Sequence, residues 1–309
     1  MKQISQEKLD HIVKESMPFT RTGKVATYIP ELSKANADAL GIWIYDVNGE
    51  TIHAGDVDTR FTIQSVSKVV TLIYALEAYG EEVFTRIGVE QTADAFNSII
   101  KLETRNNGKP LNPLINAGAI ATTSFIIEKE GKDGFIKLSN FLRKLAQNES
   151  IAVNMSVYES EQRTGDTNRA LAYFQKGVKT FSASVEDVLE TYFKTCSLEV
   201  QAKDLAQIAR VIANNGLNPE TDEQLFSAQT ARMTKAIMST CGMYDSSGHF
   251  ALHVGIPSKS GVGGGIMSVV PGKFGIGIIG PALDDKGNSA AGVELLSRLS
   301  KEYSLSIFG

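Results

Sequence analysis

The sequence predicts an α+β fold, in which one antiparallel sheet is assembled from both ends of the chain, with flanking helices and an inserted helical part. Strand-like segments lie near the start of the chain, helical periodicity dominates from Ser65 to about Ser239, and strands return after Tyr244. We expect the 309 residues to form a single domain. Its expected parts are a sheet-containing part, residues 1–64 plus 245–309, and a mainly helical part, residues 65–244.

The first elements expected are a helix and a β-hairpin. Residues 5–16 place apolar side chains on one helical face, which predicts an opening helix. Residues 40–47 and 51–54 are strand-like, and Asn48-Gly49 between them suits a tight turn with positive φ. The sheet is therefore expected to begin near the start of the chain and to begin antiparallel.

The middle of the chain is expected to be helical, and its end to return to strands. Several helical segments are followed by glycine, and Ser184 and Asp187 have the spacing of a capping pair. Helical periodicity is found in segments 66–79, 117–129, 134–147, 168–176, 184–196 and 201–214. The strands expected after Tyr244 are 250–254, 264–270 and 274–280, and a final amphipathic helix is expected over 289–303.

The charge balance argues against nucleic acid as a partner. Lys and Arg number 31 against 35 Asp and Glu, a formal net charge of −4, whereas a nucleic-acid binder carries a basic patch and a high pI. No apolar run reaches the length of about 18 residues expected of a membrane span, and the chain opens without the apolar segment of a secretory signal. We therefore expect a cytoplasmic enzyme without a membrane partner.

Neither the cysteines nor the histidines predict a metal site, and no cofactor is expected. Cys196 and Cys241 lack metal-ligand spacing and fit a reducing compartment, where such thiols are usually small buried hydrophobes. The histidines fall in no H-E-x-x-H or similar pattern, which also disfavours a His-based triad. Solvated or strand-packed roles are expected for them, with the last two flanking a strand: His11, His53, His249 and His253.

The strongest local pattern is S-x-x-K, formed by Ser65 and Lys68 at the start of an apolar helix. Side chains at i and i+3 share one helical face, so the lysine amine can reach the serine hydroxyl. Lysine acts as a base only if burial or a nearby cation lowers its pKa, and the apolar residues after Lys68 favour that desolvation. The alternative is a chance pattern, with Ser as an N-cap and Lys facing water.

A second motif, Lys259-Ser260-Gly261, lies late in the chain in a glycine-rich, strand-like segment. An early S-x-x-K helix and a late K-[ST]-G strand occur together in serine β-lactamases and penicillin-binding proteins. There an edge strand faces the nucleophile and offers a backbone N–H to the oxyanion. Both motifs in this order favour acyl transfer, although the glycines from Gly261 to Gly265 also suit a bulged strand without a ligand.

Polar side chains in otherwise apolar surroundings are further candidates. Glu161 and Asn168 are seven positions apart, two turns on one face if the helix is continuous, although Gly165 lies between them. By composition alone, such side chains are more often capping or turn residues than ligands. The candidates are Asn116, Glu161, Asn168, Tyr192 and Tyr244.

Seven linked segments together resemble the glutaminase family, whose fold is similar to that of the serine β-lactamases. They follow the family's order from about residue 20 to residue 265 and so cover most of the chain. The segments are GKVATYIPEL, FTIQSVSKVV, NPLINAGAI, SEQRTGDTNRALAY, YFKTCSLEV, CGMYDSSGHFA and KSGVGGG.

The resemblance implies hydrolysis of the side-chain amide of L-glutamine to L-glutamate and ammonia. It makes Ser65 the nucleophile and Lys68 the general base, with Tyr192 and Tyr244 also catalytic, and it implies a homo-oligomer, a tetramer. The S-D-N triplet of β-lactamases is absent, so a tyrosine hydroxyl is expected where its serine would lie. The substrate-binding positions implied are Ser65, Gln64, Tyr28, Asn116, Glu161, Asn168, Tyr192, Tyr244 and Val262.

The chemistry of free glutamine agrees with these positions. Glu161 is the natural partner of the substrate ammonium, and Asn116, Asn168 and the tyrosines can hold its carboxylate. The oxyanion would be held by the backbone N–H groups of Ser65 and Val262. Two other functions stay open at this point, a penicillin-recognising enzyme and a catalytically silent glutamine-binding module.

Overall fold

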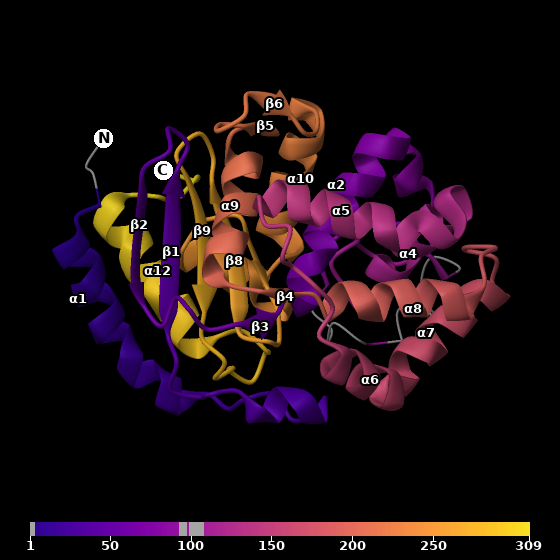
Figure 1. Ribbon diagram of the computed structural model, residues 1–309, viewed down its shortest axis with the longest axis horizontal. Coiled ribbons are helices and arrows are strands. Elements are labelled where there is room, and N and C mark those ends of the chain that lie inside the picture. Colours follow the sequence, from indigo (N-terminus) through magenta and orange to yellow (C-terminus); the bar gives the residue numbers. More distant parts are fainter. Residues whose placement is uncertain (1–3, 93–97, 99–107) are drawn as a thin grey trace.

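The structure, a computed structural model, describes residues 4–92, 98 and 108–309. Residues 93–97 and 99–107 of the expected helical part lie outside the described residues. Figure 1 shows the main sheet toward one end of the molecule and most of the helices toward the other.

The main sheet has five strands in the order β2-β1-β9-β8-β7, and all neighbouring strands are antiparallel. Because β1 and β2 come from the start of the chain and the other three from its end, the predicted α+β fold with a sheet built from both termini is confirmed. The strands are β1 (Gly41–Asp46), β2 (Thr51–Gly55), β7 (Ser258–Ser260), β8 (Gly265–Val270) and β9 (Phe274–Ile279).

Two short pairs of strands lie outside the main sheet. β3 (Phe61–Thr62) pairs with β4 (Glu199–Val200), and this pair ties the segment before Ser65 to a connection within the helical part. β5 (Leu217–Asn218) pairs with β6 (Glu223–Gln224).

The predicted hairpin turn joins β1 and β2. Gly49 has a φ of 108°, a conformation that glycine adopts without strain. The Asp46 N–H donates to the Glu50 carbonyl at 2.8 Å and closes the turn. The resulting register places Tyr45 opposite Thr51.

Helices pack on both faces of the sheet (Figure 1). α1 (Gln6–Ser16) and α12 (Ala290–Tyr303) bury their apolar residues against β1 and β9 on one face. α9 (Ala202–Ala213) lies on the other face, close to β9. A Cβ added to Gly277 would lie 1.9 Å from the Ala202 carbonyl oxygen, so glycine is required for this approach.

Most of the remaining helices form the helical side of the molecule, whereas α11 (Ser247–His253) and η1 (Met17–Thr22) contribute apolar side chains to the core beneath α1 and α12. The other α-helices are α2 (Ser67–Tyr79), α4 (Asn116–Glu130), α5 (Gly134–Ala146), α6 (Met155–Thr164), α7 (Asp166–Gly177), α8 (Val185–Cys196) and α10 (Ala228–Cys241). The other short 3-10 helices are η2 (Pro30–Lys34), η3 (Gln64–Val66), η4 (Gly80–Thr85), η6 (Gly131–Asp133) and η7 (Tyr244–Ser246).

The strand predicted over 250–254 is wrong, because this segment ends helix α11. Its two buried apolar residues, Phe250 and Val254, are four positions apart, a spacing that fits one helical turn as well as an alternating strand. The first strand of the C-terminal part is β7 instead. Helices α6 and α10 were not among the predicted segments, and each begins after a side-chain cap, Asn154 and Ser227 respectively.

Candidate active site

Ser65 lies in η3, the short turn that leads directly into α2. The residue before it, Gln64, has a φ of 48°, in the left-handed region that non-glycine residues rarely adopt. Such strain persists only where the surrounding structure imposes it, and it often marks a functional site. Ser65 and Lys68 expose only 8% and 1% of their surfaces, so the S-x-x-K pair is buried and does not face water.

Lys68 is linked by hydrogen bonds to two of the other candidates. Its Nζ donates to Asn116 Oδ1 at 2.6 Å, and Asn116 Nδ2 donates to Asn168 Oδ1 at 2.9 Å. Burial lowers the pKa of Lys68 from 10.5 to about 8, against opposing contributions from Cys196 and Glu161. A neutral amine is therefore accessible near physiological pH.

Glu161 is the buried carboxylate of the site, with 6% of its surface exposed. Burial raises its pKa from 4.5 to about 7, while a hydrogen bond with the Gln64 side chain and the charge of Lys68 lower it. The carboxylate therefore interacts with Gln64 and Lys68, the side chains next to the nucleophile. These interactions do not fully offset the cost of burying its negative charge. A cationic ligand group would satisfy it.

Glu161 and Asn168 lie on two separate helices, α6 and α7, with Gly165 between them. From the sequence, a helix interrupted at Gly165 was the alternative to one continuous helix. A Cβ added to Gly165 would lie 2.6 Å from the Phe193 ring and 2.8 Å from the Glu161 carbonyl oxygen. The glycine thus lets the corner pack tightly on α8, and the corner brings both side chains toward Lys68.

The two predicted tyrosines are buried around the same centre. Tyr244 has a φ of 56°, and its hydroxyl donates to the Ser260 carbonyl at 3.1 Å. Burial raises the pKa of Tyr244, while a hydrogen bond with Ser65 lowers it. Burial, and next the neighbouring Cys196 and Glu161, raise the pKa of Tyr192 well above its usual range. Both phenols are therefore neutral hydrogen-bonding groups.

Tyr28 lines a cavity beside the buried residues of the site, called here the entrance cavity. Its side chain is 53% exposed, yet burial of the hydroxyl end raises its pKa, and Tyr244 and Glu161 add to this effect. The entrance cavity, of about 750 Å³, opens between residues 22–28, Tyr244, Val262 and residues 283–287. This cavity connects the predicted residues Tyr28, Tyr244 and Val262.

The K-S-G segment lies against the nucleophile turn. A Cβ added to Gly261 would lie 2.9 Å from the Ile63 carbonyl oxygen and 3.4 Å from the Ser65 amide nitrogen. A Cβ added to Gly263 would lie 2.5 Å from the Thr62 carbonyl oxygen. Only glycines allow the chain after β7 to approach the turn so closely, and Val262 between them lines the entrance cavity.

Two buried residues of the site were not predicted to have a role. Lys259 is fully buried, its Nζ donates to the Ser260 carbonyl at 2.5 Å, and the same atom lies 4.2 Å from the centre of the Tyr244 ring. Burial, and then the nearby Lys68, lower its pKa strongly. In the sequence, Lys259 is marked only by its place in the K-S-G motif.

Cys196 is the second of these residues, and the sequence predicted it to be only a small buried hydrophobe. Its Sγ lies 3.9 Å from Ser67 Oγ, and it shares a hydrogen bond with Tyr192 one helical turn earlier. Burial raises the pKa of the thiol to about 12. The four-residue spacing between Tyr192 and Cys196 on α8 was the pattern in the sequence that could have indicated this contact.

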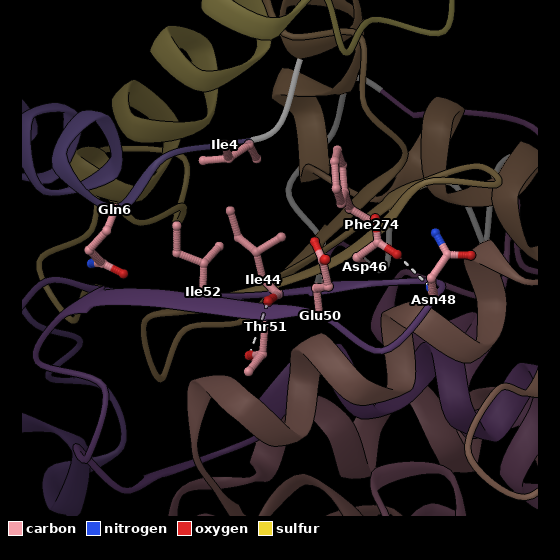
Figure 2. Close-up of a pocket in the computed structure, with 9 residues that line it drawn as sticks. All are labelled: Ile4, Gln6, Ile44, Asp46, Asn48, Glu50, Thr51, Ile52 and Phe274. Carbon is pink, nitrogen blue, oxygen red and sulfur yellow. Dashed lines mark hydrogen bonds between the residues drawn. The ribbon is translucent and has the colours of Figure 1, made fainter. Parts of the chain in front are cut away.

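A second cavity, of about 410 Å³, lies away from these residues (Figure 2). It is bounded by the start of α1, the β1–β2 hairpin and Phe274, at the sheet edge opposite β7. None of the predicted site residues lines it.

Within residues 4–92, 98 and 108–309, no cluster of three or more His, Cys, Asp or Glu could hold a metal ion. No helix in the described part of the chain is long and apolar enough to cross a membrane.

Comparisons with known proteins point to one family. A family model described as glutaminase matches residues 23–308. A curated glutaminase of Clostridium tetani is 54% identical over 306 residues, covering 99% of this chain and 100% of that protein. Glutaminase 2 of Clostridium perfringens is 50% identical over 301 residues, covering 97% and 99%.

Solved structures of glutaminases match the whole fold. A probable glutaminase of Bacillus subtilis has a TM-score of 0.91 at 39% identity, covering 98% of this chain and 97% of that one. A Bacillus subtilis glutaminase in covalent complex with 5-oxo-L-norleucine, formed by reaction with 6-diazo-5-oxo-L-norleucine, has a TM-score of 0.89 at 38% identity, covering 98% and 99%.

Proposed function

The chain belongs to the glutaminase family of amide-hydrolysing enzymes, and from this membership we propose that it hydrolyses L-glutamine through a glutamyl-serine intermediate, with Ser65 as nucleophile and Lys68 as general base. One observation carries the proposal. The buried Lys68 follows Ser65 by one helical turn, and Gly261 packs so close to the nucleophile turn that a Cβ on it would lie 3.4 Å from the Ser65 amide nitrogen. A base and an oxyanion-binding edge therefore flank one hydroxyl.

The substrate is held at its amino-acid end. The Glu161 carboxylate, which is buried and only weakly compensated, pairs with the glutamine ammonium. Asn116, Asn168 and Tyr192 supply neutral hydrogen-bond donors for the glutamine carboxylate. Gln64 fixes Glu161 through their hydrogen bond, and Tyr28 borders the entrance.

Acylation begins when Ser65 Oγ attacks the side-chain amide carbon. The neutral Lys68 amine donates one N–H to Asn116 and accepts the Ser65 proton with its lone pair. The oxyanion is stabilised by the backbone N–H groups of Ser65 and Val262. Loss of one such donor typically raises the barrier by about 2.7–4 kcal/mol.

The C–N bond then breaks as the leaving nitrogen gains a proton and departs as ammonia. Tyr244, whose hydroxyl is hydrogen-bonded with Ser65 and with the Ser260 carbonyl, gives its own proton to the leaving nitrogen and is reprotonated from Lys68, which holds the proton taken from Ser65. Water attacks the ester carbon, the bond to Ser65 Oγ breaks, and Ser65 regains its proton as L-glutamate leaves.

The test is ammonia release from glutamine and from asparagine, and alcohol release from a simple ester, by the parent chain and by Ser65→Ala. We expect release from glutamine, and a loss of about 10⁴-fold or more in Ser65→Ala with glutamine binding retained in calorimetry. Ser124→Ala, another buried serine with its hydroxyl bonded to a helix carbonyl, is the matched control. Turnover by Ser65→Ala near the parent rate would refute the role of Ser65.

We also propose that the single domain assembles as a homotetramer and works in the cytoplasm. The family resemblance supports the tetramer. Both cysteines are free and buried, which is consistent with a reducing compartment. Light scattering after size exclusion tests the tetramer, and a monomeric mass would contradict it.

A further inference from the structure

Helix α11 carries two histidines on one side that the proposed reaction does not use. His249 and His253 are one helical turn apart, and both are exposed. Their ring centroids lie 4.2 Å apart, with the ring planes tilted by 49°. We expected this pair to flank a strand, in which residues four positions apart share a face but lie about 13 Å from each other.

The other two histidines have different surroundings. His53 stacks on Trp43 with ring centroids 4.2 Å apart and only 16° between the planes, and His11 lies 3.3 Å from the Glu15 carboxylate. The core contact of α11 is made by Phe250, which is buried. Packing of the helix therefore gives no reason for two facing imidazoles at its surface.

The separation of the two rings matches that of two imidazoles on one metal ion. With metal–nitrogen bonds of about 2.0–2.1 Å, each ring centroid lies about 3.2 Å from the metal. Ligands at adjacent 90° positions then have centroids about 4.5 Å apart, and tetrahedral ligands about 5.2 Å apart. The observed 4.2 Å fits the adjacent positions.

We propose that His249 and His253 form a surface site for a divalent transition metal. Their geometry favours Cu²⁺ or Ni²⁺, which take imidazole nitrogens in square-planar or tetragonal arrangements, over tetrahedral Zn²⁺. Among the residues that the structure describes, no third His, Cys, Asp or Glu completes a cluster, so water fills the other coordination positions.

A metal held by both residues would link two successive turns of α11. This helix is tied to η7 at its start, because Ser247 Oγ donates to the Tyr244 carbonyl at 2.8 Å and accepts from the Met243 N–H at 3.0 Å. In the unfolded chain the two imidazoles have no fixed separation. Metal binding is therefore expected to stabilise the folded state and to raise its melting temperature.

The experiment is calorimetric titration of the full chain, carrying no histidine tag, with NiCl₂, CuCl₂ and ZnCl₂. Thermal unfolding is recorded in parallel, with and without each metal. The variants are His249→Gln and His253→Gln, and His11→Gln and His53→Gln are the matched controls. Melting of every variant in EDTA shows whether the substitution itself disturbs the fold.

We expect one Ni²⁺ or Cu²⁺ per chain, bound more tightly than Zn²⁺, with a higher melting temperature in the parent. Each α11 variant should lose at least about tenfold in affinity, since even loss of an outer-shell partner costs 10–100-fold. The controls should bind as the parent does. Parent-like binding by either α11 variant, loss of binding in a control, or no binding of Ni²⁺ and Cu²⁺ by the parent would overturn the site.

Discussion

Between α1, α12 and the sheet, the interior consists of apolar side chains such as Ile42, Ile276 and Leu295, all with no exposed surface. Between η3, α4 and α6 the interior is just as buried, but it contains Lys68 and Glu161. The first region stabilises the fold by removing apolar surface from water. The second region opposes folding, since two ionisable groups have lost their hydration.

The pKa values indicate the free-energy cost of burying these two charged groups. Glu161 moves from 4.5 to about 7 and Lys68 from 10.5 to about 8, and each change corresponds to about 3 kcal/mol. The polar interior therefore serves the reaction at a cost in stability, whereas the apolar interior beneath α12 stabilises the fold. Substitutions in the two regions should therefore separate activity from stability.

Among substitutions that compare the two regions, the largest effect on activity is expected from Lys68→Met, which replaces the amine with an apolar chain of similar length. Loss of the base should lower kcat by about 10²–10⁴-fold. The pKa of Lys68 is lower in the fold than 10.5, so its protonation below about pH 8 opposes folding, and that opposition fades as the pH rises toward 10.5. The free energy of unfolding at pH 7 should thus equal or exceed that of the parent.

Lys301→Met, an exposed position on α12, is the control for both measurements. A Lys68→Met variant that is far less stable than the parent would contradict the comparison, and one that keeps the parent kcat would remove Lys68 as base.

Glu161→Gln should weaken glutamine binding by about 10–100-fold, because a charged hydrogen bond of about 1.5–3 kcal/mol is lost. The variant should be no less stable at pH 8, where the parent carries a buried carboxylate. Calorimetry with glutamine and chemical unfolding measure the two effects. Glu159→Gln, an exposed position on the same helix, is the control, and a glutamine Kd unchanged by Glu161→Gln would contradict the ammonium assignment.

Below about pH 8, kcat should rise about tenfold for each pH unit, since Lys68 acts in its neutral form. The active form of Glu161 is also deprotonated, so glutamine KM should increase below about pH 7. Both groups therefore change activity in the same direction. Steady-state rates at saturating glutamine from pH 6 to 9 measure the first effect, and a kcat that is flat or falls across this range would contradict it.

The smallest effect on activity is expected from Leu295→Ala in the apolar region. It should lower the free energy of unfolding by about 2–5 kcal/mol through lost burial and a cavity, with the kcat and KM of the folded protein unchanged. Leu252→Ala is the control, because that side chain is 79% exposed. A large change in KM with Leu295→Ala would show that the two regions are coupled.

The sequence could predict the parts of the fold that depend on local chemistry. Asn48-Gly49 determines its turn through backbone conformation alone, and Ser184 caps α8 through the Asp187 N–H as expected. The segment 250–254 was mistaken for a strand because two apolar residues four apart fit both periods. That ambiguity is removed only by packing against the rest of the molecule.

The candidate site could be predicted in its members but not in its geometry. The motifs identified Ser65 and Gly261, yet their close approach depends on the sheet that joins the two ends of the chain. The left-handed Gln64 and the stacking of Lys259 on Tyr244 depend likewise on long-range packing. No local pattern carries that information.

The most direct test of the central claim is chemical labelling of the nucleophile. The full chain is treated with 6-diazo-5-oxo-L-norleucine, the reagent that formed the covalent complex in the Bacillus subtilis relative, and its peptides are mapped by mass spectrometry. We expect one 5-oxo-norleucyl adduct per chain, on Ser65, which excess glutamine prevents. An adduct on another residue, such as Cys196, with Ser65 unmodified would contradict this expectation.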